Sequence, residues 1–423
     1  MTPVLDLLRR NRNYRYTWMG QVVSEIGDYF NNIAVFSLVI QTTGSGLAVS
    51  GVMLARAIPA VMAGPVAGVV LDRFDRKRVM IASDLVRAAV ALAFLLTLSG
   101  GRSWLLYVLS ALLMFASPFF SSGRASILPS IAAPGEVHTA NSLTQVTEWS
   151  TLTLGTLLAG FSAAKFGYHW AFIFNSFSFL FSALAISRLR GHFRASQAHA
   201  TPALRPWRDY TEGLRYIRSV PLIFGVCLLT VGWATGGGAA QILFTLFGEV
   251  VFHRGARGIG SVWGFAGLGL LAGGALGHLL GKRLAFPGYR RTISAAYLAH
   301  GAAYVLFSQM TSYGLALLFI ALSRVGQATC SVLNYSKLMK HTQDQYRGRV
   351  FATLETLRWS VMTISMAAAG VASQYWSPRA IGAVAGVLSS LTGIFWGWAS
   401  WTGRLPEPDA LATAGPSAGP SYA

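Results

Sequence analysis

Twelve long apolar segments dominate the sequence and decide what it can fold into. Each has about 18 or more predominantly apolar residues, enough for a helix to cross a hydrocarbon core of about 30 Å. A helix also satisfies its own backbone hydrogen bonds where no water is present. The sequence therefore predicts an all-α integral membrane protein with transmembrane helices at 17–41, 47–71, 79–99, 104–128, 141–166, 169–187, 221–251, 259–281, 292–310, 313–336, 349–374 and 379–401.

The composition agrees with this class. Hydrophobic residues make up 53% of the 423 residues and charged residues 12%, whereas about 25% of the residues of an average soluble domain are charged. Most of the helix surface is therefore expected to face lipid.

The net charge of +19 is explained by where the charges lie. If the N-terminus is cytoplasmic, most Lys and Arg residues fall in cytoplasmic loops. The positive-inside rule then predicts an inner (plasma) membrane protein with both termini in the cytoplasm, and nucleic acid is not an expected partner. Ten Lys and Arg residues lie outside the cytoplasmic regions. Those in the outer loops are Arg102, Lys165, Arg254, Arg257 and Arg379, and those within the helices are Arg56, Arg87, Arg124, Arg324 and Arg358.

Nothing in the sequence indicates catalysis or a bound cofactor. Cys227 and Cys330 fall inside predicted helices without the spacing of a metal site, and the eight histidines are scattered. The sequence contains neither a Gly-x-Ser-x-Gly motif nor a phosphate-binding loop. We therefore expect that the protein is neither an enzyme nor a metalloprotein. We also expect it to be a monomer.

The twelve segments divide into six and six. We predict an N-terminal bundle at 1–189, a cytoplasmic linker at 190–219, a C-terminal bundle at 220–404 and a disordered tail at 405–423. The linker can form an amphipathic helix from about Trp207 to Ile217, which we expect on the inner membrane surface. Duplicated halves suit a transporter that works by alternating access.

A charged loop, GVVLDRFDRK, joins the second and third segments. It resembles the loop motif of the major facilitator superfamily, which reads Gly, three residues, Asp, Arg or Lys, any residue, Gly, Arg, and Arg or Lys. Asp75 stands where that motif has its second Gly. With the segments SEIGDYF, DLVRA and RGRVFATLE, the chain looks like the branch of drug:proton antiporters that contains macrolide-efflux and enterobactin-export proteins. The loop residues are Gly68, Asp72, Arg73, Asp75, Arg76 and Lys77.

The resemblance implies a major facilitator fold of two pseudo-symmetric six-helix bundles. It also implies that the loop is a latch between the halves, with Asp72 near Arg347 and Arg349. The alternative is a topology anchor without gating. Gly64 and Gly68 are expected to let their helix approach a neighbour closely.

Ionisable residues inside the membrane are costly and need partners or protons. Two pairs at i and i+3, Asp84–Arg87 and Glu355–Arg358, are expected to be structural. Arg56 lies at the same predicted depth as Asp28. On the first helix, polar residues form one stripe, and the fifth helix has a shorter one; these are Gln21, Glu25, Asp28 and Asn32, and Asn141, Gln145 and Glu148.

These residues suggest a mechanism. We hypothesise that Asp28, assisted by Glu25 or Glu148, takes up a proton from outside and releases it inside while substrate moves outward. The alternative is a permanent Asp28–Arg56 pair. Arg124 can pair with Glu148 or attract an anionic substrate, and the same choice stays open for Arg324.

The expected function is secondary active transport, namely proton-coupled efflux of amphipathic or lipophilic small molecules. An importer or facilitator is the alternative within transporters, and a non-transporting receptor or scaffold is the alternative outside them.

Two glycine features are expected to shape the second half. The TGGGAA sequence at 235–240 is expected to bend the seventh helix, and a small-residue packing face is expected from Gly269, Gly273, Gly277 and Gly281.

Overall fold

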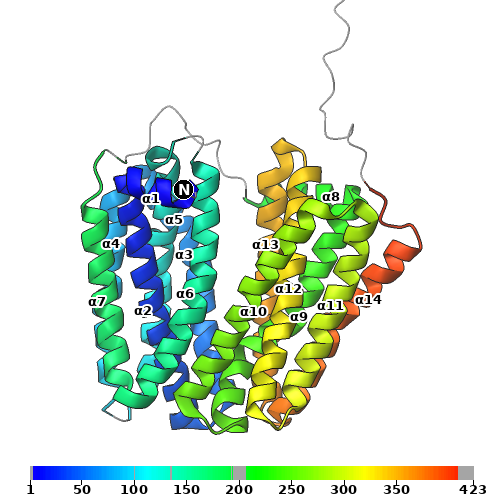
Figure 1. The fold of residues 1–423 in the computed structure, drawn as a ribbon. Helices are drawn as coiled ribbons and strands as arrows, with labels where there is room; N and C mark the ends of the chain where they lie inside the picture. Colours follow the sequence, from blue (N-terminus) through cyan, green and yellow to red (C-terminus); the bar gives the residue numbers. More distant parts are fainter. Residues whose placement is uncertain (1–2, 100, 134–135, 192, 194–205, 408–423) are drawn as a thin grey trace, which may run out of the picture. The chain divides into compact units, whose positions relative to one another are not determined.

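The structure is a computed structural model that describes residues 3–99, 101–133, 136–191, 193 and 206–407 (Figure 1). Every regular element in these ranges is helical. Most of the predicted tail, 408–423, and the linker residues 192 and 194–205 lie outside the described residues.

The twelve predicted transmembrane segments correspond to twelve long helices. In the first half these are α2 (Arg12–Thr43), α3 (Gly46–Arg73), α4 (Arg76–Ala93), α5 (Trp104–Ile131), α6 (Val137–Phe166) and α7 (Tyr168–Ser187). A short helix, α1 (Pro3–Arg10), precedes them, and a 3₁₀ turn, η1 (Phe94–Thr97), extends α4.

The second half begins with α8 (Pro206–Ser219). It continues with α9 (Pro221–Leu246), the π-helical turn η2 (Phe247–Val251), α10 (Gly255–Arg283), α11 (Phe286–Gln309), α12 (Tyr313–His341), α13 (Asp344–Ala372) and α14 (Pro378–Trp401).

Eight of the long helices in the described ranges are apolar enough to cross a membrane by length and composition. The helices α2, α6, α11 and α13 are not among them. Two of these, α2 and α6, carry the predicted polar stripes, so their lower hydropathy agrees with side chains that need partners inside the protein.

Local sequence sets several helix ends. Asn11 caps α2 by accepting a hydrogen bond from the backbone N–H of Tyr14 at 3.0 Å. The same helix ends at Gly44, whose φ of +63° favours glycine. Ser45 then caps α3 by accepting from the N–H of Ala48 at 3.4 Å.

The chain forms two compact units. Unit 1 contains the described residues of Met1–Ala200, Gln241–Leu268 and Met366–Pro378, and unit 2 those of Thr201–Ala240, Gly269–Ser365 and Arg379–Ala423. The ends of α9 and α13 and the first part of α10 therefore group with the first six long helices. The predicted division into bundles at 1–189 and 220–404 stays a prediction.

In unit 1, α2 packs against α6 and α7, and α5 packs against α3 and α4. Small residues allow the closest approaches. A Cβ on Gly160 of α6 would lie 2.8 Å from the carbonyl oxygen of Ala256 and 2.9 Å from Cα of Gly260 in α10. Glycine is therefore needed where α6 meets α10.

In unit 2, the predicted glycine face of α10 packs against α12. A Cβ on Gly273 would lie 2.8 Å from Cα of Val325, and one on Gly277 would lie 3.1 Å from the carbonyl oxygen of Thr329. This confirms the packing face that the four-residue spacing predicted.

The predicted bend at TGGGAA stays a prediction, because a continuous helix can still curve. The helix α9 runs without interruption through residues 235–240. A Cβ on Gly236 would collide with the carbonyl oxygen of Ala385, and one on Gly238 with that of Met362. These glycines make room for α13 and α14, so their role is close packing.

The predicted amphipathic helix is present as α8, and part of its apolar face packs on unit 2. Ile217 is buried in the core of unit 2, and the Tyr216 ring stacks on Tyr346 with centroids 4.4 Å apart. Glu212 pairs with Arg349 of α13 at 2.8 Å. Within unit 2, α8 therefore docks on α13, which offers both an aromatic partner and a charge partner. Its expected place on the inner membrane surface stays a prediction. The side chain of Trp207 lies outside the described residues.

Candidate functional site

The structure explains the departure of the charged loop from the family motif. Asp75 caps α4, because its side chain accepts a hydrogen bond from the N–H of Arg78 at 3.0 Å. Arg76 donates to the carbonyl oxygen of Ser126 in α5 at 2.9 Å, and Lys77 to that of Leu189 after α7 at 2.8 Å. Three of the predicted loop residues thus fasten the loop to unit 1.

The other loop residues, Gly68, Asp72 and Arg73, are exposed. Within unit 1, a Cβ built at Gly64 or Gly68 meets no described atom within 4 Å. The predicted close approach of these glycines is therefore not made in this unit. The latch role of Asp72 stays a prediction.

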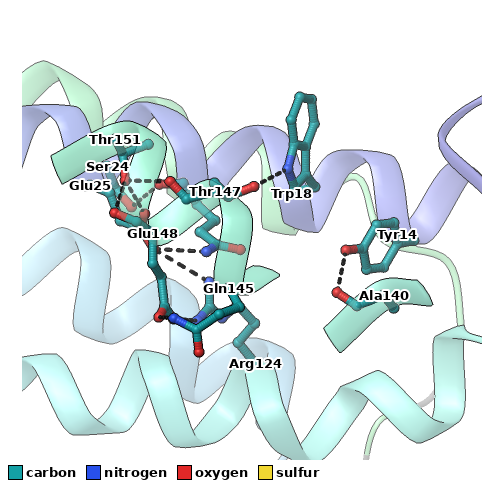
Figure 2. Close-up of polar contacts among 11 residues, drawn as sticks. Tyr14, Trp18, Ser24, Glu25, Arg124, Ala140, Gln145, Thr147, Glu148 and Thr151 are labelled. Carbon is teal, nitrogen blue, oxygen red and sulfur yellow. Dashed lines mark hydrogen bonds and ion pairs between the residues drawn. The ribbon is translucent and has the colours of Figure 1, made fainter. Parts of the chain in front are cut away.

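A cluster of partly buried charges joins α2, α5 and α6 (Figure 2). The guanidinium group of Arg124 lies 3.6 Å from the carboxylate of Glu25 and 3.6 Å from that of Glu148. The pairing of Arg124 with Glu148 was one of the two alternatives for this residue, but the contact with Glu25 was not predicted. One cation therefore serves two carboxylates from different helices.

Hydrogen bonds orient both carboxylates of this cluster. Glu25 accepts from Gln21 at 2.8 Å and from the hydroxyl of Thr151 at 2.6 Å, and Glu148 accepts from Gln145 at 3.2 Å. The side chain of Glu148 is 43% exposed, against 22% for Glu25. Glu148 is thus the more accessible of the two acids.

Two further contacts hold α2 beside α6. Trp18 donates to the hydroxyl of Thr147 at 2.9 Å, and the hydroxyl of Tyr14 donates to the carbonyl oxygen of Ala140 at 3.0 Å (Figure 2). These bonds fix which faces of the helices meet, and so they position Glu25 opposite Thr151.

Asp28 lies one turn beyond Glu25 on α2. Its Oδ1 atom is buried and has no hydrogen-bond partner among the described residues. Arg56 of α3 donates to the amide oxygen of Asn32, the next polar residue of the stripe. A direct pair between Arg56 and Asp28 was one alternative. In the structure the hydrogen-bond partner of Arg56 is instead the amide of Asn32.

The two predicted i, i+3 pairs are confirmed. Asp84 pairs with Arg87 in α4, where both side chains are almost fully buried. The guanidinium group of Arg87 also lies over the rings of Phe120 and Phe179, with centroids at 4.7 and 4.3 Å. The pair Glu355–Arg358 in α13, at 2.5 Å, is more exposed.

The charges of this region do not balance when every group is ionised. Away from the helix ends, α2–α7 carry one carboxylate more than guanidinium groups. One proton would therefore make the set neutral, which matters where dielectric screening is weak. The carboxylates are Glu25, Asp28, Asp84 and Glu148, and the guanidinium groups are Arg56, Arg87 and Arg124.

The last predicted basic residue, Arg324, lies in unit 2 and is buried in α12. Its neighbour Ser323 contacts His300 of α11. The Nδ1 atom of His300 lies 2.8 Å from the hydroxyl oxygen and 2.9 Å from the carbonyl oxygen of Ser323. Arg324, His300 and Tyr304 lie with Trp233 around one narrow gap that has no room for a water molecule. Sequence reasoning missed His300, although an ionisable residue within a membrane helix was the signal that could have found it.

The described residues contain no group of three or more His, Cys, Asp or Glu that could hold a metal ion. Cys227 and Cys330 are free and buried.

The sequence profile of the Major Facilitator Superfamily matches residues 17–364. The chain is 27% identical over 380 residues to the MFS-type transporter YfiS of Bacillus subtilis (strain 168), which covers 87% of this chain and 88% of YfiS. It is 26% identical over 348 residues to the multidrug efflux pump Tap of Mycolicibacterium fortuitum, with 79% and 82% covered.

A shorter match links the chain to macrolide efflux protein A of Streptococcus pyogenes, at 39% identity over 72 residues, 17% of this chain and 18% of that protein. Among solved structures, the peptide transporter POT has a similar fold, with a TM-score of 0.69, 15% identity and 93% and 95% of the two chains covered.

The chain therefore belongs to the Major Facilitator Superfamily, and its fold is the all-α membrane fold of that family. The predicted resemblance to efflux proteins is confirmed. Proteins of this family are transporters and not enzymes, so the chain is a multi-pass membrane transporter of small molecules.

Proposed function

We propose that the chain exports amphipathic or lipophilic small molecules in exchange for protons. The observation that carries the proposal is the single guanidinium group of Arg124, 3.6 Å from both Glu25 and Glu148. Two carboxylates that share one cation form an anionic set when both are ionised. Protonation of either one makes the set neutral, so a proton can bind and leave at low cost.

In this proposal Glu148 exchanges the proton with water, because it is the most exposed member of the cluster. Glu25 and Asp28, whose Oδ1 atom is buried, share the polar stripe of α2 and change their proton occupancy as the transporter switches sides. Arg56, through Asn32, holds positive charge near Asp28. When one of the two carboxylates takes up a proton, it no longer pairs with Arg124, which then pairs with the other carboxylate alone.

The driving force is sufficient for export. One proton that moves inward across about 100 mV and about one pH unit supplies roughly 2.3 plus 1.4 kcal/mol, which supports a substrate gradient of roughly 500-fold. The efflux direction is supported by the names of the relatives Tap and macrolide efflux protein A.

We place the transporter in the plasma membrane as a monomer, with both termini in the cytoplasm, because the basic loops then lie inside. The charged loop after α3 would close the cytoplasmic side in one state through Asp72 and Arg73, which are exposed. Asp75, Arg76 and Lys77 would hold that loop rigidly on unit 1.

The test is ethidium transport in proteoliposomes with an imposed pH gradient. The wild-type protein should accumulate dye and release protons in proportion to it. Glu25→Gln and Glu148→Gln should lose the proton movement, whereas the control Glu355→Gln, in the paired and separate site of α13, should keep it. Full coupling in both cluster variants would contradict the proton role. Dye movement that ignores the pH gradient in the wild type would favour a facilitator.

A further inference from the structure

Unit 2 has an apolar groove between α9 and α14. Its volume is about 530 Å³. The walls are side chains that stay partly exposed after folding, and they come from both helices: Phe224, Leu228, Leu391, Phe395 and Trp398.

The floor of the groove is rigid. Trp396 is 1% exposed and donates its indole N–H to the carbonyl oxygen of Arg290 at 3.2 Å. A Cβ on Gly225 would lie 2.8 Å from Leu405 and 2.9 Å from Trp396, so glycine is what lets these two side chains close the floor. The groove is thus a hollow between two closely packed helices.

One end of the groove carries a fixed positive charge. The guanidinium group of Arg404 lies over the Trp398 ring, 4.4 Å from its centroid, and the backbone N–H of Arg404 donates to Ala399 at 2.9 Å. Arg290 donates to the carbonyl oxygen of Leu405 at 2.9 Å and so fixes the segment after α14. An anionic group at this end would meet a preorganised cation.

Both helices that form the groove are long and apolar enough to span a membrane. A groove on such helices opens to lipid, whose acyl chains match the walls. The cation stands just after the end of α14, at the depth where headgroups begin. An anionic phospholipid has both parts in the required order: an apolar chain, then a negative phosphate.

We propose that this groove binds one anionic phospholipid, with an acyl chain along Leu228 and Phe395 and the phosphate against Arg404. The site does not depend on the proton chemistry of unit 1, so the two proposals fail or succeed separately.

The test uses the full-length protein, purified and stripped of lipid in detergent, then titrated with phosphatidylglycerol or with phosphatidylcholine of the same chains. Native mass spectrometry measures the bound lipid. We expect tighter binding of phosphatidylglycerol. Arg404→Gln should weaken it about fivefold, because one basic group near a membrane surface contributes about 1 kcal/mol. The control Arg291→Gln removes an exposed charge of α11 outside the groove and should change nothing.

A second pair of variants tests the apolar part. Leu228→Trp should fill the groove and remove the bound lipid, whereas Leu298→Trp, at an equally exposed position of α11, should not. In the wild type, a photoreactive phosphatidylglycerol should crosslink to 221–229 or 391–405. Equal affinity for the two lipids, equal effects of Arg404→Gln and Arg291→Gln, or crosslinks confined to other helices would each overturn the proposal.

Discussion

The polar residues that join α2, α5 and α6 differ in kind from those that lie between α11 and α12. The first region holds carboxylates that share a guanidinium group, Glu25 and Glu148 around Arg124. The second holds His300, Ser323 and Arg324, and neither α11 nor α12 contains an Asp or Glu. The acids of the membrane interior are thus concentrated in unit 1.

The difference teaches where each kind of chemistry can take place. A carboxylate cluster with a surplus negative charge can take up a proton. Arginine donates hydrogen bonds, and serine and histidine can donate or accept them, so the second group suits recognition of a polar group on a substrate. We therefore expect variants in unit 1 to change coupling and variants in α11 and α12 to change affinity.

The largest effect on stability is expected for the fully buried pair in α4. Arg87→Gln leaves Asp84 without its cation and should reduce the free energy of unfolding by about 3 to 5 kcal/mol. Denaturant unfolding in detergent measures it. The double variant with Asp84→Asn should recover most of the loss. Arg358→Gln, in the more exposed pair of α13, should cost under about 1 kcal/mol; equal losses at the two sites would break the comparison.

The next effect is expected at the shared cation. Arg124→Gln leaves Glu25 and Glu148 uncompensated, and an unpaired charge in the membrane costs at least about 2.5 kcal/mol, which corresponds to roughly 70-fold in transport rate. Initial rates of ethidium export measure it. Adding Glu25→Gln should restore part of the rate, because it removes one of the two carboxylates. No recovery in the double variant would argue against charge balance as the cause.

A smaller effect is expected at His300. His300→Ala removes the contact with Ser323 and should cost about 1 to 2 kcal/mol of stability. In transport, the apparent KM should rise while the number of protons moved per substrate stays constant. Proton release and dye export in the same vesicles give both quantities. A changed stoichiometry would place proton chemistry in α11 and remove the contrast between the two regions.

An effect of about 1 kcal/mol on stability is expected at the loops that precede α4 and α11. Asp75→Ala removes the cap of α4 and should reduce stability by about 1 kcal/mol. The helix α11 is the third long helix of the second half, as α4 is of the first, and it starts after Ala285, which has extended backbone and no side-chain cap. Ala285→Asp should therefore stabilise the protein. Thermal unfolding of both variants tests these opposite signs, and two changes of the same sign would contradict the capping argument.

The smallest effect concerns α8. A hydrogen bond from Arg208 and the nearby Arg349 hold the pKa of Glu212 below its usual range. The pair therefore contributes above the unfolded pKa of about 4.3 and loses its contribution as pH falls through the lower folded value. Amide hydrogen exchange of α8, corrected for intrinsic rates, should be slower than in Glu212→Gln at pH 7 and should approach it in acid. Identical exchange at pH 7 would mean that Tyr216 and Ile217 alone dock the helix.

Much of the fold follows from local sequence. Apolar length predicts the long helices, and the spacing of Asp84 and Arg87 predicts their pair, because both depend only on neighbours along one helix. The packing role of TGGGAA could not be predicted, because glycine permits both bends and close contacts, and only the facing carbonyl oxygens of Ala385 and Met362 reveal the close contacts.

The sequence by itself determined that the protein spans a membrane, how many long helices it has and which of them carry charge. Only the tertiary structure decided that Glu25 shares Arg124 with Glu148, that Arg56 bonds to Asn32, and that α8 docks on α13. The physical reason is that hydrophobic length and helical spacing are properties of one segment. Contacts between segments depend on the rotation and depth of each helix, which packing fixes.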